Sequence, residues 1–407
     1  MSARACTRSL IVSILLAIPA SPLSAQNAGQ ALADRLRSYN QALDLAGGIA
    51  EARANPRGLR SPRARAWYTL LLARNGDGRA ALAVADSLRA ADRRSPWSSF
   101  ARAAALGYGF SDSTDAVLAA SEELLRRAPR HPDAAQLRGA TLVNSGRPLE
   151  ALAVVDSFLA RNPNSVPHIV LRGNITWAAA GATRPPNPAR KDSAITLWAR
   201  ARALDSTDVL AWSAAGSRLL NDGRLAEALP LLRRASELAP FSVRVNRDYW
   251  RALRSRHSSE PERAKAEALP AIDRVLAARG SDPRVLLEIA SEYGAFRMPE
   301  AQRALEDRIL REYPSTVSAE WVLVNRYRAV ADAMRDTTVR DSTLNARYRR
   351  LVEEFIARPT HAEERLLGDA YISLFSIACW ATSQSFSWSA RDNETNRFPS
   401  RSDGCRM

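Results

Sequence analysis

Histidine has the widest chemical range of the residue types in this chain, because it can bind a metal ion or move a proton near neutral pH. The four histidines lie in four different turn regions, and two of them neighbour a proline. They are His131, His168, His257 and His361. None has a second ligand type at the spacing of a metal site. We therefore expect structural or surface roles for all four, and no metal site.

Motifs for other kinds of site chemistry are also missing from the sequence. No Gly-rich phosphate loop follows a strand-like segment, and no Gly-x-Ser-x-Gly turn presents a nucleophilic serine. The sequence thus predicts no catalytic residues, no cofactor and a protein that is not an enzyme.

Cysteine chemistry is limited to Cys6, Cys379 and Cys405. Cys6 lies in the amino-terminal segment that we expect to be removed. The other two form no Cys-x-x-Cys motif, so a redox site is not expected. In an oxidising compartment they can pair as a disulfide or stay as free thiols, and the sequence leaves both possibilities open.

Small residues recur at a fixed spacing within residues 133–240. Three copies of the pattern fill corresponding positions: Gly139, Gly146, Ala151 and Pro163; then Gly173, Ala194 and Ala201; then Trp212, Gly216, Gly223, Ala228, Ala235 and Pro240. Gly139 and Gly173 lie 34 residues apart, and later copies keep this period except where the Pro-rich loop 183–191 adds nine residues. A period of about 34 residues is typical of a repeated pair of helices.

Two antiparallel helices joined by a turn account for these residue types. Small residues such as Gly139 and Ala151 allow the helices of one pair to cross closely. Gly146 permits a left-handed turn between the helices, and Pro163 ends the second one. The pattern resembles the tetratricopeptide repeat (TPR) family, most closely in the third copy. This resemblance implies an all-α fold, a right-handed α-solenoid of antiparallel helix pairs.

The amino terminus has the features of a signal peptide, which we place at residues 1–25. Arg4 and Arg8 precede an apolar run, and Leu23-Ser24-Ala25 forms a small-residue cleavage site. The run is shorter than the about 20 residues that cross a bilayer. We therefore expect an exported chain, periplasmic or secreted, with no membrane span in its mature form.

The repeat array is expected to fill residues 26–378, and residues 379–407 are expected to form an irregular, disordered tail. An entry helix at 31–54 precedes about eight helix pairs. Outside the three in-phase copies, the pairs are placed at 64–74 with 79–91, 97–108 with 112–127, 243–254 with 261–278, 283–293 with 299–312, and 317–333 with 339–357.

The resemblance to the TPR family also implies a concave groove lined by the first helix of each pair. In the in-phase copies, the family's groove positions hold Gln136, Ala140, Asn144, Val170, Asn174, Trp177, Ser213, Ser217 and Asn221. Among these, Gln136, Asn144, Asn174, Trp177, Ser213, Ser217 and Asn221 are the candidate peptide-binding residues. Alternatively these side chains are simply solvated, and Trp177 is covered by the loop 183–191. No Lys or Arg occupies these positions, so the family's clamp for carboxyl termini is not implied.

Three classes of function are compatible with the sequence. The first is an exported TPR scaffold that binds a protein or peptide, and the second is the helical arm of a larger exported enzyme or redox protein. The third is a nucleic-acid or anionic-polymer binder that uses the surplus of arginine in a chain with a formal net charge of +15. Basic residues are interleaved with Asp and Glu rather than clustered, which argues against a phosphate track and predicts no nucleic-acid partner.

The last helix of the array, expected at 362–375, has an apolar face formed by Leu367, Ala370, Tyr371, Leu374 and Phe375. No Leu, Ile or Val follows Ile377 to build a covering helix. Either the aromatic residues of the tail fold back over this face, or it stays open and allows self-association. We favour the open face.

Overall fold

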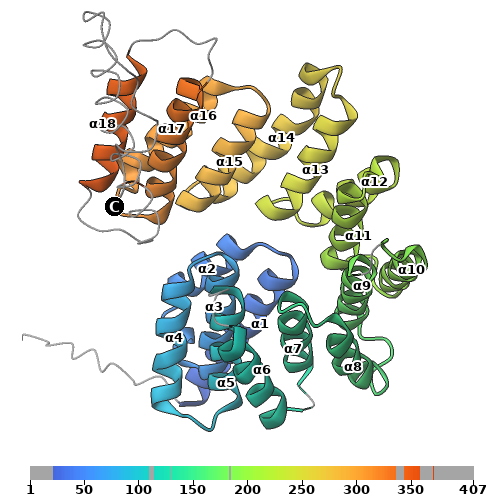
Figure 1. Cartoon of the computed structure of the whole chain (residues 1–407). Coiled ribbons are helices and arrows are strands. Elements are labelled where there is room, and N and C mark those ends of the chain that lie inside the picture. The colour runs from blue at the N-terminus through green and yellow to red at the C-terminus, as the bar shows by residue number, and fades with distance from the viewer. Residues whose placement is uncertain are drawn as a thin grey trace, which may run out of the picture. The chain divides into compact units, whose positions relative to one another are not determined.

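The computed structural model describes residues 22–109, 114–129, 131–182, 185–335, 343–357 and 370, which contain helices and turns but no strand. The chain divides into two compact units, Met1–Leu219 and Leu220–Met407, and each is described here by itself. The all-α fold expected from the sequence is confirmed (Figure 1). Within the described residues, no helix is both long and apolar enough to cross a membrane.

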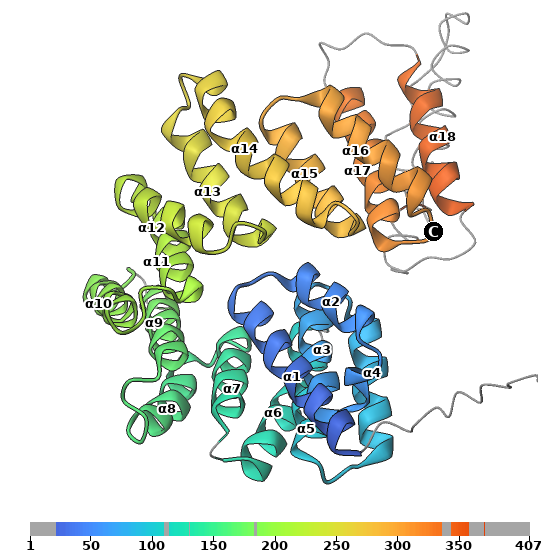
Figure 2. The same ribbon diagram turned by 180° about the vertical axis from the view of Figure 1, so that it is seen from behind.

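Helices of the first unit follow one another as five antiparallel pairs, and the first helix of a sixth pair crosses into the second unit. They are α1 (Pro22–Gln41), α2 (Leu45–Ala54), α3 (Pro62–Arg74), α4 (Gly78–Ala91), α5 (Pro96–Gly109), α6 (Thr114–Arg127), α7 (Pro132–Asn144), α8 (Pro148–Leu159), α9 (Val166–Gly181), α10 (Pro188–Leu204) and α11 (Val209–Asn221). From α1 to α10 each helix packs on the next, and the first helices of neighbouring pairs also pack together, as α1 does on α3 and α7 on α9. The same succession is visible from behind in Figure 2.

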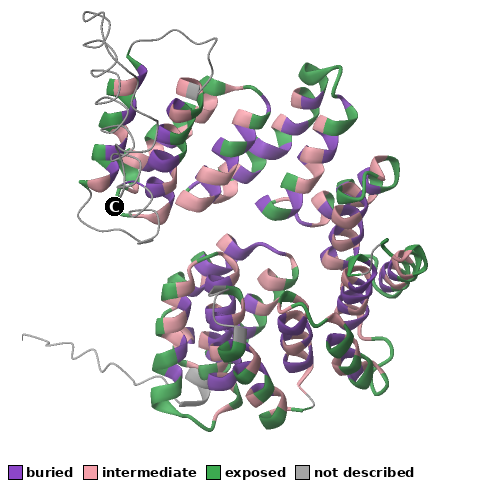
Figure 3. Cartoon of the chain, viewed as in Figure 1, coloured by how far each residue is buried: buried purple, intermediate pink, exposed green. Residues whose placement is uncertain are grey.

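The second unit continues this arrangement. Its helices are α12 (Leu225–Leu238), α13 (Val243–Arg256), α14 (Pro261–Arg279), α15 (Pro283–Ala295), α16 (Pro299–Glu312), α17 (Val317–Arg335) and α18 (Leu344–Ile356). Here too α13 packs on α15 and α15 on α17. Buried residues form stripes along the helices of both units, as expected for amphipathic helices that cover one another (Figure 3).

Turns within the pairs confirm the predicted role of glycine. Gly146 has a φ of +73° and Gly223 a φ of +78°, the left-handed values that glycine adopts without steric cost. At the first of these turns the Gly146 N–H donates to Val143 O at 3.0 Å and the Arg147 N–H donates to Leu142 O at 2.8 Å. This pair of bonds closes the end of α7 and reverses the chain into α8.

Helix boundaries agree with the sequence within a few residues at most positions, with two corrections. The expected entry helix 31–54 is wrong, because the chain breaks between α1 and α2. Leu43 adopts a left-handed φ of 56°, and the Asp44 carboxylate accepts a hydrogen bond from the Gly47 N–H at 3.0 Å, so that Asp44 caps a new helix. The helix expected at 339–357 begins at Leu344.

At two of the three expected close crossings, Gly139 and Gly173, a side chain one turn beyond the expected alanine lies nearest to the glycine. A methyl group added to Gly139 would lie 3.0 Å from Val155 Cγ2, and one added to Gly173 would lie 2.5 Å from Trp198 Nε1. Val155 and Trp198 each follow the predicted alanine, Ala151 or Ala194, by four residues, which is one helical turn. Both alanines are fully buried. A larger side chain therefore fills the space beside each glycine, next to the buried alanine.

The expected terminal helix 362–375 and the tail 379–407 lie outside the described residues, except for Ala370. Ala370 is fully buried in the cluster that α17 and α18 form, which also contains Tyr327, Val352 and Phe355. Cys6, Cys379, Cys405 and His361 also lie outside the described residues.

Candidate binding site on the inner face of the first unit

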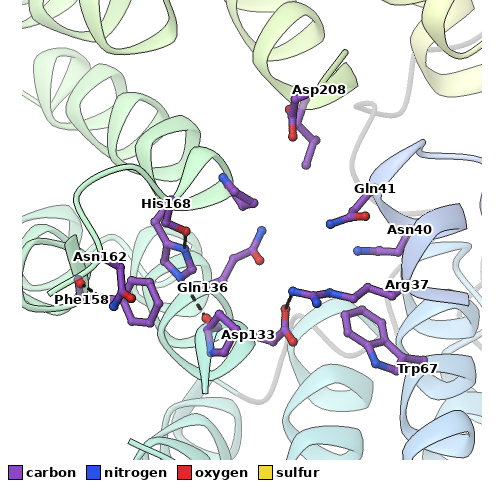
Figure 4. Close-up of a pocket in the computed structure, with 14 residues that line it drawn as sticks. Arg37, Asn40, Gln41, Trp67, Asp133, Gln136, Phe158, Asn162, His168 and Asp208 are labelled. Atoms are coloured by element: carbon purple, nitrogen blue, oxygen red, sulfur yellow. Dashed lines mark hydrogen bonds and ion pairs between the residues drawn. The ribbon is translucent and has the colours of Figure 1, made fainter. Parts of the chain in front are cut away.

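A cavity of about 430 Å³ lies on the inner face of the first unit (Figure 4). Side chains from the first helices of several pairs, α1, α3, α7, α9 and α11, contribute most of its lining. The lining residues are Arg37, Asn40, Gln41, Trp67, Pro132, Asp133, Gln136, Phe158, Asn162, Ser165, Pro167, His168, Asp208 and Leu210. Its volume is within the range of roughly 300–1,000 Å³ that is typical of ligand pockets.

An ion pair forms one side of this cavity. A guanidinium nitrogen of Arg37 in α1 lies 3.8 Å from a carboxylate oxygen of Asp133 in α7. The Arg37 guanidinium also lies over the Trp67 ring, 5.8 Å from its centroid. On its other side Asp133 approaches His131 Nδ1 at 3.5 Å. Burial lowers the pKa of His131, and Arg37 and Arg63 lower it further, although Asp133 acts in the opposite direction.

His168 connects two helix pairs at the wall of the cavity. Its Nε2 lies 2.9 Å from the Pro132 carbonyl oxygen, and its Nδ1 lies 2.8 Å from Ser165 Oγ. Because a carbonyl only accepts hydrogen bonds, Nε2 carries the proton and Nδ1 accepts from the serine hydroxyl in the neutral ring. The ring stacks on Phe158 with centroids 3.9 Å apart. Burial is the main cause that lowers the pKa of His168, which favours this neutral form.

Four amide side chains surround the open part of the cavity: Asn40, Gln41, Gln136 and Asn162. Asn40 accepts a hydrogen bond from Arg74, and Asn162 donates to Phe158 O at 3.2 Å. Neither Gln41 nor Gln136 forms a side-chain hydrogen bond within the described part of the chain. Figure 4 shows the two glutamines approaching the cavity from opposite sides.

Asp208 lies across the cavity from the ion pair, at the start of α11 (Figure 4). Its Oδ1 accepts a hydrogen bond from the Ala211 N–H at 2.8 Å, so it caps that helix. Burial raises the pKa of Asp208 and the nearby Asp205 carboxylate raises it further, whereas the hydrogen bonds from Ala211 and Leu210 oppose these effects. No basic side chain among the described residues forms an ion pair with it.

The arrangement is suited to noncovalent recognition. Amide groups supply both donors and acceptors, and the charged groups lie at the two edges of the cavity. Among the described residues, no three His, Cys, Asp or Glu side chains converge in a way that could hold a metal ion. His131, His168 and His257 occupy separate positions, and His257 Nε2 lies 3.2 Å from Glu267 Oε1.

Of the seven groove residues predicted from the sequence, Gln136 lines the cavity and the other six do not. Asn144 is exposed at the end of α7, Asn174 and Ser217 are half-buried, and Ser213 is buried. Asn221, the last residue of α11, accepts a hydrogen bond from Arg251 at 2.7 Å. Their role in binding stays a prediction.

Trp177 is half-buried between two side chains. Lys191 Nζ lies 5.0 Å from its ring centroid, and the centroid of the Trp198 ring lies 5.6 Å away. Lys191 belongs to the segment 183–191 that was expected to cover Trp177 if the tryptophan did not bind a partner. These contacts fit the alternative in which Trp177 is covered by this segment and packs within the protein.

Sequence reasoning missed Arg37, Asn40 and Gln41, because α1 precedes the in-phase repeats and its positions had no counterpart in the repeated pattern. Their spacing was nevertheless a usable signal. Residues three and four positions apart lie on one face of a helix, so these three polar side chains mark a polar face at the end of α1.

Comparisons with known proteins gave similarity in structure alone. No protein-family model and no curated protein sequence matches the chain. The solved TPR protein TTC0263 from Thermus thermophilus is 16% identical, with 54% of this chain and 99% of that chain covered and a TM-score of 0.39. PilW, a type IV pilus biogenesis factor, is 15% identical, with 64% and 98% covered and a TM-score of 0.35. Human IFIT1 in a dimer with PPP-AAAA is 14% identical, with 87% of both chains covered and a TM-score of 0.48.

Assignment of the fold rests on the chain's own helix pairs. The 34-residue spacing, the left-handed glycine between the helices of a pair and the packing of successive first helices all occur together in this structure. By these features, the chain is an all-α protein with a TPR-like fold of stacked antiparallel helix pairs.

Proposed function

We propose that this protein is an exported helical-repeat scaffold that binds an extended polypeptide segment in the cavity on the inner face of its first unit. The observation that carries this proposal is the pair of unengaged amides, Gln41 and Gln136, that approach the cavity from opposite walls.

An amide side chain matches a peptide backbone, because both carry one donor group and one acceptor group. A segment in extended conformation leaves its backbone N–H and C=O groups free to bond with both walls. The apolar residues Phe158, Pro167 and Leu210 lie beside these amides and offer contact to the side chains of such a segment.

Export is part of the proposal and follows from the signal-peptide features of residues 1–25. The helix α1 begins at Pro22, so cleavage before Gln26 would shorten it by about one turn. Arg37, Asn40 and Gln41 lie near the other end of α1 and would be kept in the mature protein.

Site-specific photo-crosslinking tests the proposed site. A photoreactive amino acid is placed at Gln136 in the cavity, at Asn174 in the predicted groove outside it, or at the exposed Ser157 on α8 as a control. We expect a crosslinked polypeptide from the mature protein with the probe at Gln136, and none with the probe at Ser157. Crosslinks of equal yield at Gln136 and Ser157 would contradict a site on the inner face.

Matched substitutions test the chemistry of the site. Gln41→Ala and Gln136→Ala should each weaken the captured segment, because each removes one hydrogen-bonding group, which contributes about 0.5–1.5 kcal/mol. Ser157→Ala should leave binding unchanged. Binding through amides should also persist at moderate salt, whereas a nucleic-acid or polyanion partner would be released.

A further inference from the structure

We propose that the segment bound in this cavity carries a basic side chain, and that Asp208 holds its ammonium or guanidinium group. This inference rests on the proposed function and specifies the chemical class of its partner. It is carried by the distribution of charge around the cavity and by the position of Asp208 at its edge.

Besides His168, three of the lining residues carry an acidic or basic side chain: Arg37, Asp133 and Asp208. Arg37 and Asp133 form an ion pair and offset each other. His168 is buried, and burial lowers its pKa, which favours the neutral ring. The carboxylate of Asp208 is left without a basic partner in the described part of the chain. The lining of the cavity thus includes two carboxylates and one guanidinium, in a protein whose formal net charge is +15.

Asp208 retains capacity to bind after it has capped α11. A carboxylate offers about four acceptor positions on its two oxygens, and the backbone N–H groups of Ala211 and Leu210 occupy up to two of them. Removal from water makes the charged form of a carboxylate costly, which is why burial raises its pKa. A cation placed beside this carboxylate offsets that cost, so the site favours a lysine or arginine side chain over a neutral one.

Gln41 and Gln136 explain why the cation belongs to a polypeptide. Both amides lie along the cavity from Asp208 and supply hydrogen bonds that a free ion would not use. A segment with its backbone between the glutamines can reach Asp208 with one long basic side chain. Because Arg37 is already paired with Asp133, the selectivity for a basic side chain depends on Asp208.

A display library of random nonapeptides, selected against the full mature protein, tests this inference. Without a local site, the positive protein would enrich acidic peptides through long-range attraction. We expect instead that the selected peptides share a Lys or Arg at one position. Enrichment of peptides that lack a shared basic residue would overturn the inference and leave the proposed function in place. A selection that enriches no peptide would count against both.

Two charge-matched variants make the test specific. Asp208→Asn removes the charge but keeps a good helix cap, because Asn and Asp cap helices almost equally well. Asp205→Asn removes the same charge three residues earlier, where the carboxylate is exposed and binds Thr207 outside the cavity.

Fluorescence anisotropy with one selected peptide, and with its Lys or Arg replaced by Gln, gives the decisive comparison. Asp208→Asn should weaken the basic peptide by at least about fivefold, the equivalent of about 1 kcal/mol, and leave the Gln peptide unaffected. Because the Asp205 carboxylate acts on Asp208 only at a distance, Asp205→Asn should weaken the basic peptide far less and leave the Gln peptide unaffected. Equal loss with both variants, or an unchanged preference in Asp208→Asn, would overturn the assignment of Asp208. A melting temperature of Asp208→Asn close to that of the parent shows that the change in binding is not a folding defect.

Discussion

Arg37 and Asp133 form an ion pair at 3.8 Å between α1 and α7, the first helices of the first and fourth pairs. In a helical repeat protein each pair normally contacts only its neighbours. Here the inner face of the first unit curves until side chains of non-adjacent pairs meet, and the cavity lies between them. The ion pair therefore links sequence-distant parts of the cavity lining.

This link is expected to add little to stability by itself. Arg37 is 37% exposed and Asp133 is 12% exposed, and the distance between their charged atoms is long for a salt bridge. A double-mutant cycle of Arg37→Gln and Asp133→Asn, measured by urea denaturation, should give a coupling energy of about 0.2–1 kcal/mol that falls at high salt. A coupling of several kcal/mol would mean that the pair is tighter and less solvated than the structure shows.

Substitutions at two left-handed turn positions, Gly146 and Arg297, should change the stability of the protein in opposite directions. Gly146→Ala should destabilise the protein by roughly 1 kcal/mol, because a side chain is strained at a φ of +73°. Steric contact is not the cause, since a methyl group added to Gly146 meets no atom within 4 Å. Arg297 occupies the equivalent turn between α15 and α16 with a φ of 57°, and Arg297→Gly should be neutral or stabilising. Denaturation curves that move in the same direction for both variants would contradict this account.

Gly173 should be the glycine least tolerant of a methyl group in α9. Gly173→Ala would place a carbon 2.5 Å from Trp198 Nε1, so the buried indole would have to move at a cost of roughly 1–3 kcal/mol. Gly181, at the end of the same helix, has no atom within 4 Å of an added methyl group. Gly181→Ala is therefore the matched control and should cost nothing. Equal melting temperatures for both variants would show that α9 and α10 do not cross closely at Gly173.

Stability should decrease in mild acid because of His168. Its folded pKa is lowered below the ordinary value of 6.5, so the folded state binds protons less readily than the unfolded state. The stabilisation is fully present above about pH 6.5 and is lost as the pH falls through the folded pKa. His131 acts in the same direction. We expect His168→Gln to show a smaller difference in unfolding free energy between about pH 7.5 and pH 5 than the parent protein. An identical difference would mean that His168 titrates normally.

Local spacing in the sequence determined the helix pairs and their turns. A left-handed glycine and a helix-ending proline act on the residues next to them, and for this reason the turn at Gly146 could be placed without knowledge of the rest of the chain. The same reasoning failed at residues 31–54, where Leu43 adopts the left-handed conformation. At three other turns this conformation is adopted by a glycine, which can be recognised in the sequence. No glycine marks that break, and the capping contact of Asp44 becomes clear only when the backbone is seen.

The residues that line the candidate site, by contrast, are brought together only by the tertiary structure. Gln136 was predicted from its place in a repeat, but Arg37, Gln41 and Asp208 join it through the curvature of the first unit. That curvature is the sum of small rotations between neighbouring helix pairs, and each rotation depends on which side chains meet at a crossing, as Gly173 and Trp198 do. Residue spacing along the chain specifies which residues share a helix face. Only the packed helices decide which faces meet across a cavity, because that depends on contacts between residues far apart in sequence.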